Sequence, residues 1–230
     1  MLESDHYMST FFVTATGTDV GKTFVTAGLI RHLRAHGRTL EVFKPIASGF
    51  DANNWAVSDA GVLLKALEKD LTAENMDRMC PWRFAAALSP DMAAAREGKK
   101  IDFEAVVKAC AAIPERGAQT SIVEAAGGVM TPIDGAHTML DLATRLNWPV
   151  VLIAGSYLGT LSHTLTAREV LLARGLKIAA VVVSETPGSI VDLAETAAEL
   201  ARFAAPVPVI MLPRLPNQGA IAALADLIGA

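Results

Sequence analysis

The sequence predicts a single α/β domain whose parallel sheet is flanked by helices on both faces. Short, almost wholly apolar runs alternate along the chain with longer stretches of helical periodicity, which is typical of parallel sheets covered on both sides. Turns containing glycine separate most of these segments. Gly21-Lys22-Thr23 stands between the first apolar run and the first helical stretch, where a phosphate-binding loop is expected.

Composition is consistent with one compact domain. The chain has 230 residues, of which 52% are hydrophobic and 19% charged, enough apolar residues for a large core. The net charge of −4 and the scattered basic residues argue against nucleic acid as the main partner. The longest apolar runs fall far short of the roughly 20 residues of a membrane span. We therefore expect no membrane partner.

The N-terminus and the cysteines indicate a cytoplasmic protein. Residues 1–7 are acidic, lack the charged-then-apolar order of a signal peptide and are expected to form a disordered extension before a domain over residues 8–230. Cys80 and Cys110 are too few and too isolated for a disulfide framework or a zinc site. We expect both to be buried, reduced thiols.

The first half of the chain predicts two strands, over residues 10–15 and 40–45, and three helices. The helix over residues 22–35 is expected to end at Gly37 in a left-handed conformation, and that over residues 58–67 to be capped by Ser58. Residues 71–98, which include Pro81 and Pro90, are expected to be irregular, and residues 103–112 to be the third helix.

The second half repeats the pattern. We expect strands over residues 121–125, 150–155, 177–184 and 207–212. Helices are expected over residues 160–173, closed by Gly175, over residues 190–203, and from Ala220 onward. No linker separates the two halves, so one domain is predicted.

The loop before the first helix indicates nucleotide binding. Its backbone N–H groups and the helix N-terminus would hold phosphate oxygens, with Lys22 adding a charge near the β- and γ-phosphates and Thr23 a hydroxyl for Mg²⁺. The usual spacing places the first glycine of this motif at Thr16, whereas this loop has Gly17. Strand, loop and helix together predict a sheet of the P-loop NTPase type.

Further candidates follow strands, because ligands of such sheets bind outside the carboxyl ends of the strands. Lys44 and Ser48 follow the second strand and are candidates for ligand contacts. Alternatively, Lys44 is a solvated lysine at a strand edge and Ser48 is a turn-forming residue. Asp59 stands at a helix start, where it also suits the helix dipole. Glu124 closes an apolar strand and is the strongest candidate for a Mg²⁺ ligand.

Histidines and methionines give weaker signals. His137 and His163 lie near helix starts, where capping or surface roles are more probable than metal binding. The methionines of the middle region are expected to fill the core; they are Met76, Met79, Met92, Met130 and Met139.

An ordered set of short segments resembles the dethiobiotin synthetase family over nearly the whole chain. The segments are Phe12-Val-Thr, Val20-Gly-Lys-Thr23, Lys44-Pro-Ile-Ala-Ser-Gly49, Ser58-Asp-Ala60, Ser89-Pro90 with Gly98, Glu124-Ala-Ala-Gly-Gly128 with Thr131-Pro132, and Leu158-Gly-Thr-Leu-Ser-His-Thr164. Each is weak by itself. The segment from Lys44 to Ser48 distinguishes this family from other P-loop proteins.

The resemblance implies an ATP-dependent ring closure. One amine of 7,8-diaminononanoate takes up CO₂ as a carbamate, which attacks the γ-phosphate of MgATP. The second amine then attacks the carbamic–phosphoric anhydride, giving dethiobiotin, ADP and phosphate. Lys22 and Lys44 would stabilise phosphoryl transfer, and Ser48 and Thr18 would contact the diamine or its carbamate. No covalent enzyme intermediate is implied.

The same resemblance implies the remaining ligand contacts. Thr23, Asp59 and Glu124 would hold Mg²⁺. The residues implied to bind ATP are Asp19, Val20, Gly21, Lys22, Thr23, Phe24, Asp59, Glu124, Ala125, Ala126, Gly127, Ser184 and Glu185. The family is a homodimer with its substrate at the interface, so Leu158 and Ser162 would contact the substrate from the partner chain.

The phosphate loop and the segment expected at the base depart from the family pattern. Ala15, Gly17 and Asp19 stand where the family usually has glycine, aspartate and glutamate. Some members read adenine with an asparagine where this chain has Ser184-Glu185, and a serine cannot reproduce both contacts of an amide.

Two alternatives belong to other classes of function. A ParA/MinD-like ATPase switch would carry an extra lysine early in the loop, where this chain has Gly17, and the stretch 219–230 has no Lys or Arg for a basic membrane helix. The second alternative is a related amide-forming ligase or a non-catalytic domain of the same fold. The presence of Lys44 and Ser48 argues against this alternative.

Overall fold

The sheet has six parallel strands, and the fold class predicted from the sequence is confirmed. In the computed structural model, which describes residues 9–214 and 218–229, the strand order is β2-β5-β1-β6-β7-β8. The strands are β1 (Ser9–Ala15), β2 (Leu40–Phe43), β5 (Thr120–Glu124), β6 (Val150–Gly155), β7 (Ile178–Ser184) and β8 (Val209–Leu212). The expected extension over residues 1–7 lies outside the described residues.

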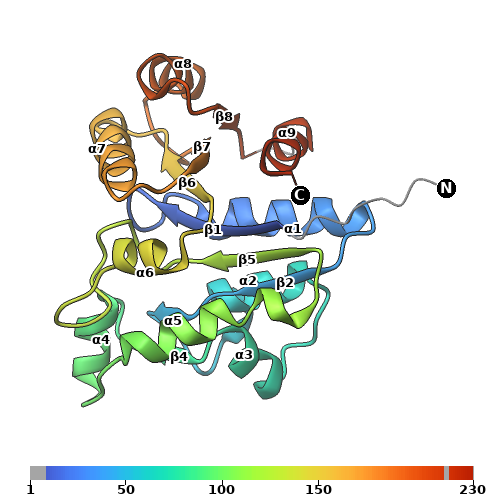
Figure 1. The fold of residues 1–230 in the computed structure, drawn as a ribbon, viewed down its shortest axis with the longest axis vertical. Helices are drawn as coiled ribbons and strands as arrows, with labels where there is room; N and C mark the ends of the chain where they lie inside the picture. Colours follow the sequence, from blue (N-terminus) through green and yellow to red (C-terminus); the bar gives the residue numbers. More distant parts are fainter. Residues whose placement is uncertain (1–8, 215–217, 230) are drawn as a thin grey trace.

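The helices cover both faces of this sheet. They are α1 (Lys22–Ala35), α2 (Asp59–Ala66), α3 (Ala73–Met79), α4 (Pro90–Arg96), α5 (Phe103–Ala111), α6 (Met139–Leu146), α7 (Thr160–Ala173), α8 (Leu193–Ala204) and α9 (Gln218–Ile228), with short 3₁₀ turns at η1 (Trp55–Val57) and η2 (Pro114–Arg116). Figure 1 shows α2 to α5 gathered at one side of β1 and α7 to α9 at the other. Within the described ranges, no helix has the length and apolar character needed to cross a membrane.

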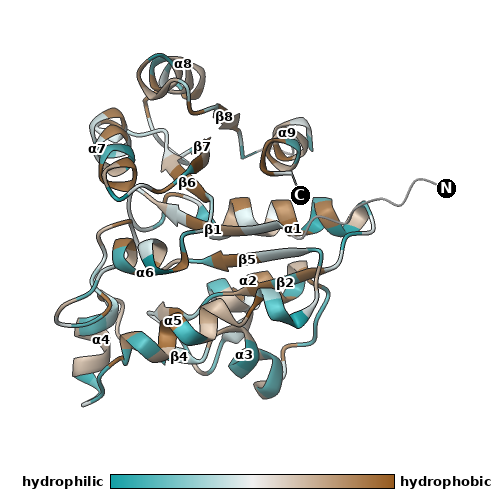
Figure 2. Ribbon diagram, viewed as in Figure 1, coloured by the Kyte–Doolittle hydropathy of each residue, from teal (hydrophilic) through white to brown (hydrophobic). Residues whose placement is uncertain are grey.

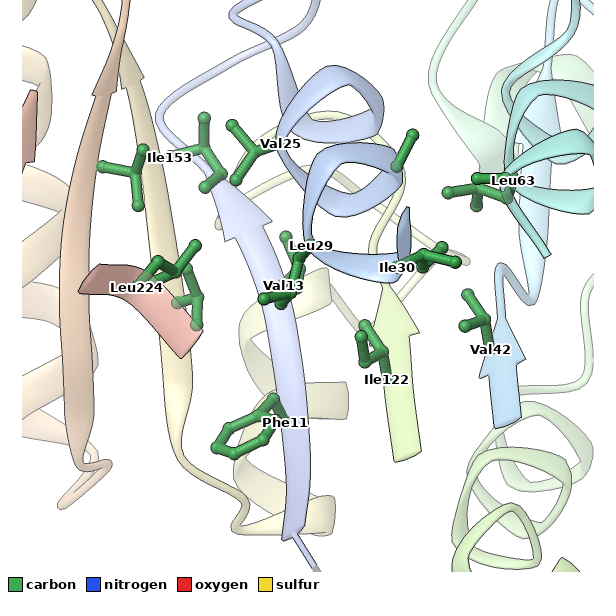
Figure 3. Close-up of a cluster of buried hydrophobic side chains, with 14 of the residues drawn as sticks. Phe11, Val13, Val25, Leu29, Ile30, Val42, Leu63, Ile122, Ile153 and Leu224 are labelled. Carbon is green, nitrogen blue, oxygen red and sulfur yellow. The ribbon is translucent and has the colours of Figure 1, made fainter. Parts of the chain in front are cut away.

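Alternation along the strands separates two cores. Phe11, Val13 and Ala15 of β1 face the core that includes α1, α2 and α9, whereas Phe12 faces the core that includes α5, α6 and α7. Figure 2 shows both polar and apolar stretches along the helices, as expected for elements with one face on the sheet. Figure 3 shows Leu29 and Ile30 of α1 lying over the strands, with Leu224 of α9 nearby.

Local sequence signals correctly predicted the ends of several helices. Helix α1 spans the predicted residues, and Gly37 has a φ of 75°, as its C-terminal role requires. Ser58 caps α2 by accepting a hydrogen bond from the Gly61 N–H at 3.1 Å. Cys80 and Cys110 are free and buried, as expected.

The predicted second strand was too long. β2 ends at Phe43, because the Lys44 N–H donates to the Met79 carbonyl instead of to β5 and Pro45 has no N–H to donate. The chain then forms β3 (Ile46–Ser48), which pairs in parallel with β4 (Trp82–Phe84).

The prediction of an irregular stretch over residues 71–98 was wrong. It holds α3, β4 and α4, whose local signals were present: Thr72 accepts from the Asn75 N–H, and Pro90 occupies the first turn of α4. Helix α6 was missed, although Thr138 and Asp141 form a capping box at its start.

Two of the five methionines were also assigned wrongly. Met76, Met79 and Met139 are buried, but Met92 and Met130 are 51% and 57% exposed. Met92 lies on the short helix α4, and Met130 lies in the segment after β5, so neither is covered by the sheet.

We predict that Leu29→Ala lowers the free energy of unfolding by about 2 to 5 kcal/mol, because the removed atoms leave a cavity between α1 and the sheet. Leu29 is 2% exposed, and Leu172, on the equally long helix α7, is 38% exposed. Leu172→Ala is the matched control and should lose less than about 1 kcal/mol. Equal losses in urea denaturation would contradict this packing.

Candidate active site

The phosphate loop connects β1 to α1 and contains two residues in the left-handed backbone conformation. Asp19 and Gly21 have φ values of 57° and 106°, and helical hydrogen bonding begins at once from the Gly21 carbonyl. The Lys22 ammonium folds back and donates to the Gly17 carbonyl at 3.0 Å. The Thr16 hydroxyl oxygen is buried and has no hydrogen-bond partner among the residues described. The loop therefore presents backbone N–H groups and a lysine to one region.

The loop after β5 supports the phosphate loop from behind. The Val129 N–H donates to the Ala15 carbonyl at 2.9 Å, and a Cβ on Gly128 would lie 3.1 Å from the Gly17 nitrogen. Gly127 has a φ of 62°. Ala125 and Ala126 are buried, and the Ala125 N–H donates to the Val13 carbonyl at 2.9 Å, so this segment is fixed against β1.

Lys44 joins three elements at the carboxyl edge of the sheet. Its Nζ lies 2.9 Å from Glu124 Oε1 at the end of β5 and 3.0 Å from Asp59 Oδ2 at the start of α2. Thr23 of α1 donates its hydroxyl to the same Glu124 oxygen at 2.8 Å. Lys44 is 2% exposed and Glu124 is fully buried, whereas the Asp59 side chain is 51% exposed. The lysine is thus not the solvated strand-edge residue of the alternative interpretation.

The charges of this cluster stabilise one another. Burial opposes the charge of Lys44, but Glu124 and Asp59 outweigh it and raise the pKa of its ammonium. Burial would raise the pKa of Asp59, yet Lys44 and the Thr23 hydroxyl hold it below its usual range. Burial and the neighbouring Lys44 lower the pKa of Lys22 to about 8.

Thr23, Asp59 and Glu124 form a suitable donor set for Mg²⁺. All three supply oxygen atoms, the ligands that this hard cation prefers. Glu124 Oε2 is buried and has no hydrogen-bond partner within residues 9–214 and 218–229, so it is available to a ligand. The residues expected to hold the metal are therefore brought together.

The residues expected to contact the substrate divide into two groups. Ser48 ends β3, four residues after Lys44, and Thr18 is exposed on the phosphate loop. Leu158 is 86% exposed and Ser162 is exposed on the first turn of α7. We call Lys44, Thr23, Asp59 and Glu124 the Lys44 cluster. In the described part of the chain, no hydrogen bond or ion pair links Leu158 or Ser162 to this cluster.

Ser184 lies behind the phosphate loop and not on its open side. Its side chain is fully buried, and a Cβ on Gly21 would lie 2.6 Å from its hydroxyl oxygen. This hydroxyl has no hydrogen-bond partner in the described residues. Ser184 therefore packs directly against Gly21 of the phosphate loop.

Arg214 is a candidate that sequence reasoning missed. Its N–H donates to Glu185 Oε2 at 2.7 Å, its Nε donates to the Glu185 carbonyl at 2.8 Å, and its guanidinium carbon lies 4.7 Å from the centre of the Phe24 ring. Phe24 and Arg214 line a cavity of about 750 Å³ between α1 and α9. Arg214 follows β8, so the carboxyl-end rule would have identified it.

The sheet, the phosphate loop and the lysine–carboxylate cluster define a nucleotide-binding protein of the P-loop class. A family model described as an AAA domain matches residues 9–223. The ATP-dependent dethiobiotin synthetase BioD of Acidiphilium cryptum is 46% identical over 89% of this chain and 93% of its own length. That of Phenylobacterium zucineum is 45% identical over 97% and 96%. The chain belongs to the dethiobiotin synthetase family, as its motifs indicated.

Solved structures of distant sequence show the same fold. The MinC:MinD cell division protein complex of Aquifex aeolicus contains a chain that superposes with a TM-score of 0.56 over 96% of both chains. Its sequence identity is only 14%, so the similarity concerns the fold alone.

We predict that Gly21→Ala destabilises the protein more than Gly37→Ala. Both glycines have positive φ, but only a Cβ at Gly21 would collide with Ser184, while nothing lies within 4 Å of one at Gly37. Gly37→Ala should cost about 1 kcal/mol of unfolding free energy. Adding Ser184→Ala should recover part of the extra loss at Gly21. Equal unfolding free energies for the two single variants would contradict the close approach.

Proposed function

We propose that this chain, an ATP-dependent dethiobiotin synthetase of biotin biosynthesis, carries out its reaction at the carboxyl edge around Lys44. The observation that supports this location is the convergence of Lys44, Thr23, Asp59 and Glu124 beside the phosphate loop. The substrates are 7,8-diaminononanoate, CO₂ and ATP, and the products are dethiobiotin, ADP and phosphate.

The proposed reaction has three steps. One amine of the diamine attacks CO₂, forming a C–N bond and losing a proton to give a carbamate. A carbamate oxygen then attacks the γ-phosphorus, and the bond to the β–γ bridging oxygen breaks to release ADP. Finally the second amine attacks the carbamoyl carbon, forming the second C–N bond and losing a proton, and phosphate leaves as the C–O bond breaks. Positioning and charge stabilisation suffice, so no nucleophilic side chain is required.

The two lysines serve different parts of the transferred group. Lys22, on the phosphate loop, would contact the β- and γ-phosphates. Lys44 directly follows β2, is paired with Glu124 at the end of β5, and would neutralise charge where the carbamate meets the γ-phosphate. Both ammonium groups are buried, which strengthens their interaction with anions relative to water.

Thr23, Asp59 and Glu124 would hold Mg²⁺. When bound, the metal would neutralise phosphate charge during transfer. Its ligands come from α1, α2 and β5, so the fold and not the local sequence sets their spacing.

The nucleotide would extend from the phosphate loop towards Arg214. Backbone groups of Asp19, Val20 and Gly21 and of Ala126 and Gly127 would contact the phosphates. The Ala125 N–H donates to the Val13 carbonyl and the Ala125 carbonyl accepts from Lys44, so Ala125 would support these groups from within. Phe24, Glu185 and Arg214 would form the end at which the base binds, with the guanidinium held over the Phe24 ring.

The active unit is proposed to be a homodimer in which Leu158 and Ser162 of one chain complete the substrate site of the other. Large apolar side chains are exposed in segments that flank the carboxyl edge, among them Val57, Met130 and Leu158. A dimer interface that covered these side chains would remove their apolar surface from water. The N-terminus of α7 would accept the substrate carboxylate. We place the enzyme in the cytoplasm, where ATP is available.

Incubation of the protein with diaminononanoate, bicarbonate and MgATP tests this function. Mass spectrometry should detect dethiobiotin in a one-to-one ratio with ADP. ATP hydrolysis without a ring product would instead favour an ATPase switch, the function class that shares this fold.

We predict that Lys44→Ala lowers turnover at least a hundredfold but weakens ATP binding less than tenfold, because Lys44 acts on the transferred group. Steady-state kinetics and calorimetric ATP titration measure the two effects. Circular dichroism is the control for folding, since the variant leaves buried Glu124 without its ammonium partner. Equal losses in turnover and in ATP affinity would show that Lys44 only binds nucleotide.

We predict that Arg214→Ala weakens ATP binding about 5- to 30-fold, because the nucleobase would lose its contact with the guanidinium, worth about 1 to 2 kcal/mol. Arg202→Ala is the matched control, since Arg202 lies 4.2 Å from the Phe203 ring on the distant helix α8. The control should change the ATP affinity less than twofold. Unchanged affinity in both variants would exclude Arg214 from the nucleotide site.

A further inference from the structure

Both carboxylates assigned to a metal already contact a cation, the ammonium of Lys44. Its Nζ is 2.9 Å from Glu124 Oε1 and 3.0 Å from Asp59 Oδ2, and it also donates to the Ala125 carbonyl at 3.4 Å. Thr23 donates its hydroxyl to Glu124 Oε1 at 2.8 Å, so that hydroxyl too is turned towards the carboxylate. Lys44 thus occupies the place of a counter-ion.

The negative charges of the cluster are already largely offset without a metal. Lys44 lies within 3.0 Å of both Asp59 and Glu124, and Lys22, beside Asp19 on the phosphate loop, is a second buried ammonium group. A divalent cation added to this set would leave an excess of positive charge in a poorly solvated region. The phosphates of a nucleotide would supply the missing negative charge.

The donor set is also incomplete by itself. Across the described residues, no group of three or more His, Cys, Asp or Glu side chains gathers to hold a metal ion. Two carboxylates and one hydroxyl leave most of the six positions around Mg²⁺ to other oxygen atoms. Phosphate oxygens next to Thr23 are suited to fill some of them.

We infer that Lys44 keeps divalent metal out of the nucleotide-free site, so that the metal enters with the nucleotide and frees Lys44 from Asp59. This inference rests on the proposed function, because it takes Thr23, Asp59 and Glu124 as the metal ligands.

Burial indicates which contact opens. Glu124 is fully buried at the end of β5, and its Oε1 can keep Lys44 while the unpartnered Oε2 binds metal. Asp59 is 51% exposed on the first turn of α2, so its side chain can turn from the ammonium to a metal at little cost. Lys44 then has one carboxylate partner fewer and is free to pair with the transferred phosphate.

Mn²⁺ binding in the absence of nucleotide tests this inference, with electron paramagnetic resonance reporting free Mn²⁺. Lys44→Gln removes the competing cation and should bind Mn²⁺ at least tenfold more tightly than the unaltered protein. Lys65→Gln is the control, since it removes an equal charge from α2 that donates to the Ala56 carbonyl at 3.2 Å and makes no ion pair within the described residues. It should change Mn²⁺ affinity less than threefold.

The unaltered protein provides a second measurement that needs no variant to fold. A non-hydrolysable ATP analogue should strengthen Mn²⁺ binding at least tenfold over the nucleotide-free protein. Equal Mn²⁺ affinity with and without the analogue would overturn the inference. A folded Lys44→Gln variant with unchanged Mn²⁺ affinity would do the same.

A further variant separates this inference from the proposed metal ligands. Glu124→Gln should abolish tight Mn²⁺ binding in the presence of the analogue. If Glu124→Gln binds Mn²⁺ normally with the analogue present, the ligand assignment fails, and the inference fails with it. If Glu124→Gln behaves as expected and Lys44→Gln does not, the ligand assignment stands and only the role of Lys44 is overturned.

Discussion

Lys44 and Glu124 each carry a full charge in a part of the protein that water hardly reaches, and neither charge would be tolerated there without the other. Their contact joins the end of β2 to the end of β5. Asp59 brings the start of α2 to the same ammonium, and Thr23 brings the start of α1 to the same carboxylate. One ion pair therefore fixes the relative positions of four elements at the edge where the phosphate loop lies.

Parallel topology makes this convergence possible. β1 lies between β5 and β6, and all six strands run in the same direction, so the segments that follow them emerge at one edge. The apolar alternation along β1 supplies a core to each face, which leaves the carboxyl edge as the place where polar groups can gather. Charged residues that would be costly in the middle of the sheet are therefore confined to its rim, where a charged substrate can neutralise them.

Close backbone packing complements this electrostatic arrangement. Because Gly21 has no side chain, Ser184 can pack directly against it. Because Gly128 has none, the loop after β5 can pack directly against Gly17 of the phosphate loop. The same compactness explains why Ser184 is hidden while Arg214, beyond the end of β8, lies on the cavity beside Phe24. The end of the site at which the base would bind thus includes Arg214, which the family comparison did not suggest, beside Phe24 and Glu185, which it did.

The sequence by itself determined the fold class, the extent of α1, the caps at Ser58 and Gly37, and the family, because periodicity, capping and motif order are local properties. It also placed Lys44, Asp59 and Glu124 near one edge. Only the tertiary structure decided that Lys44 is buried and bound to both carboxylates, that residues 71–98 form helices and a strand, and that Arg214 contacts Glu185. These contacts join residues 15 to 80 positions apart, or depend on packing against the sheet, and they exist only once the strand order and register are set.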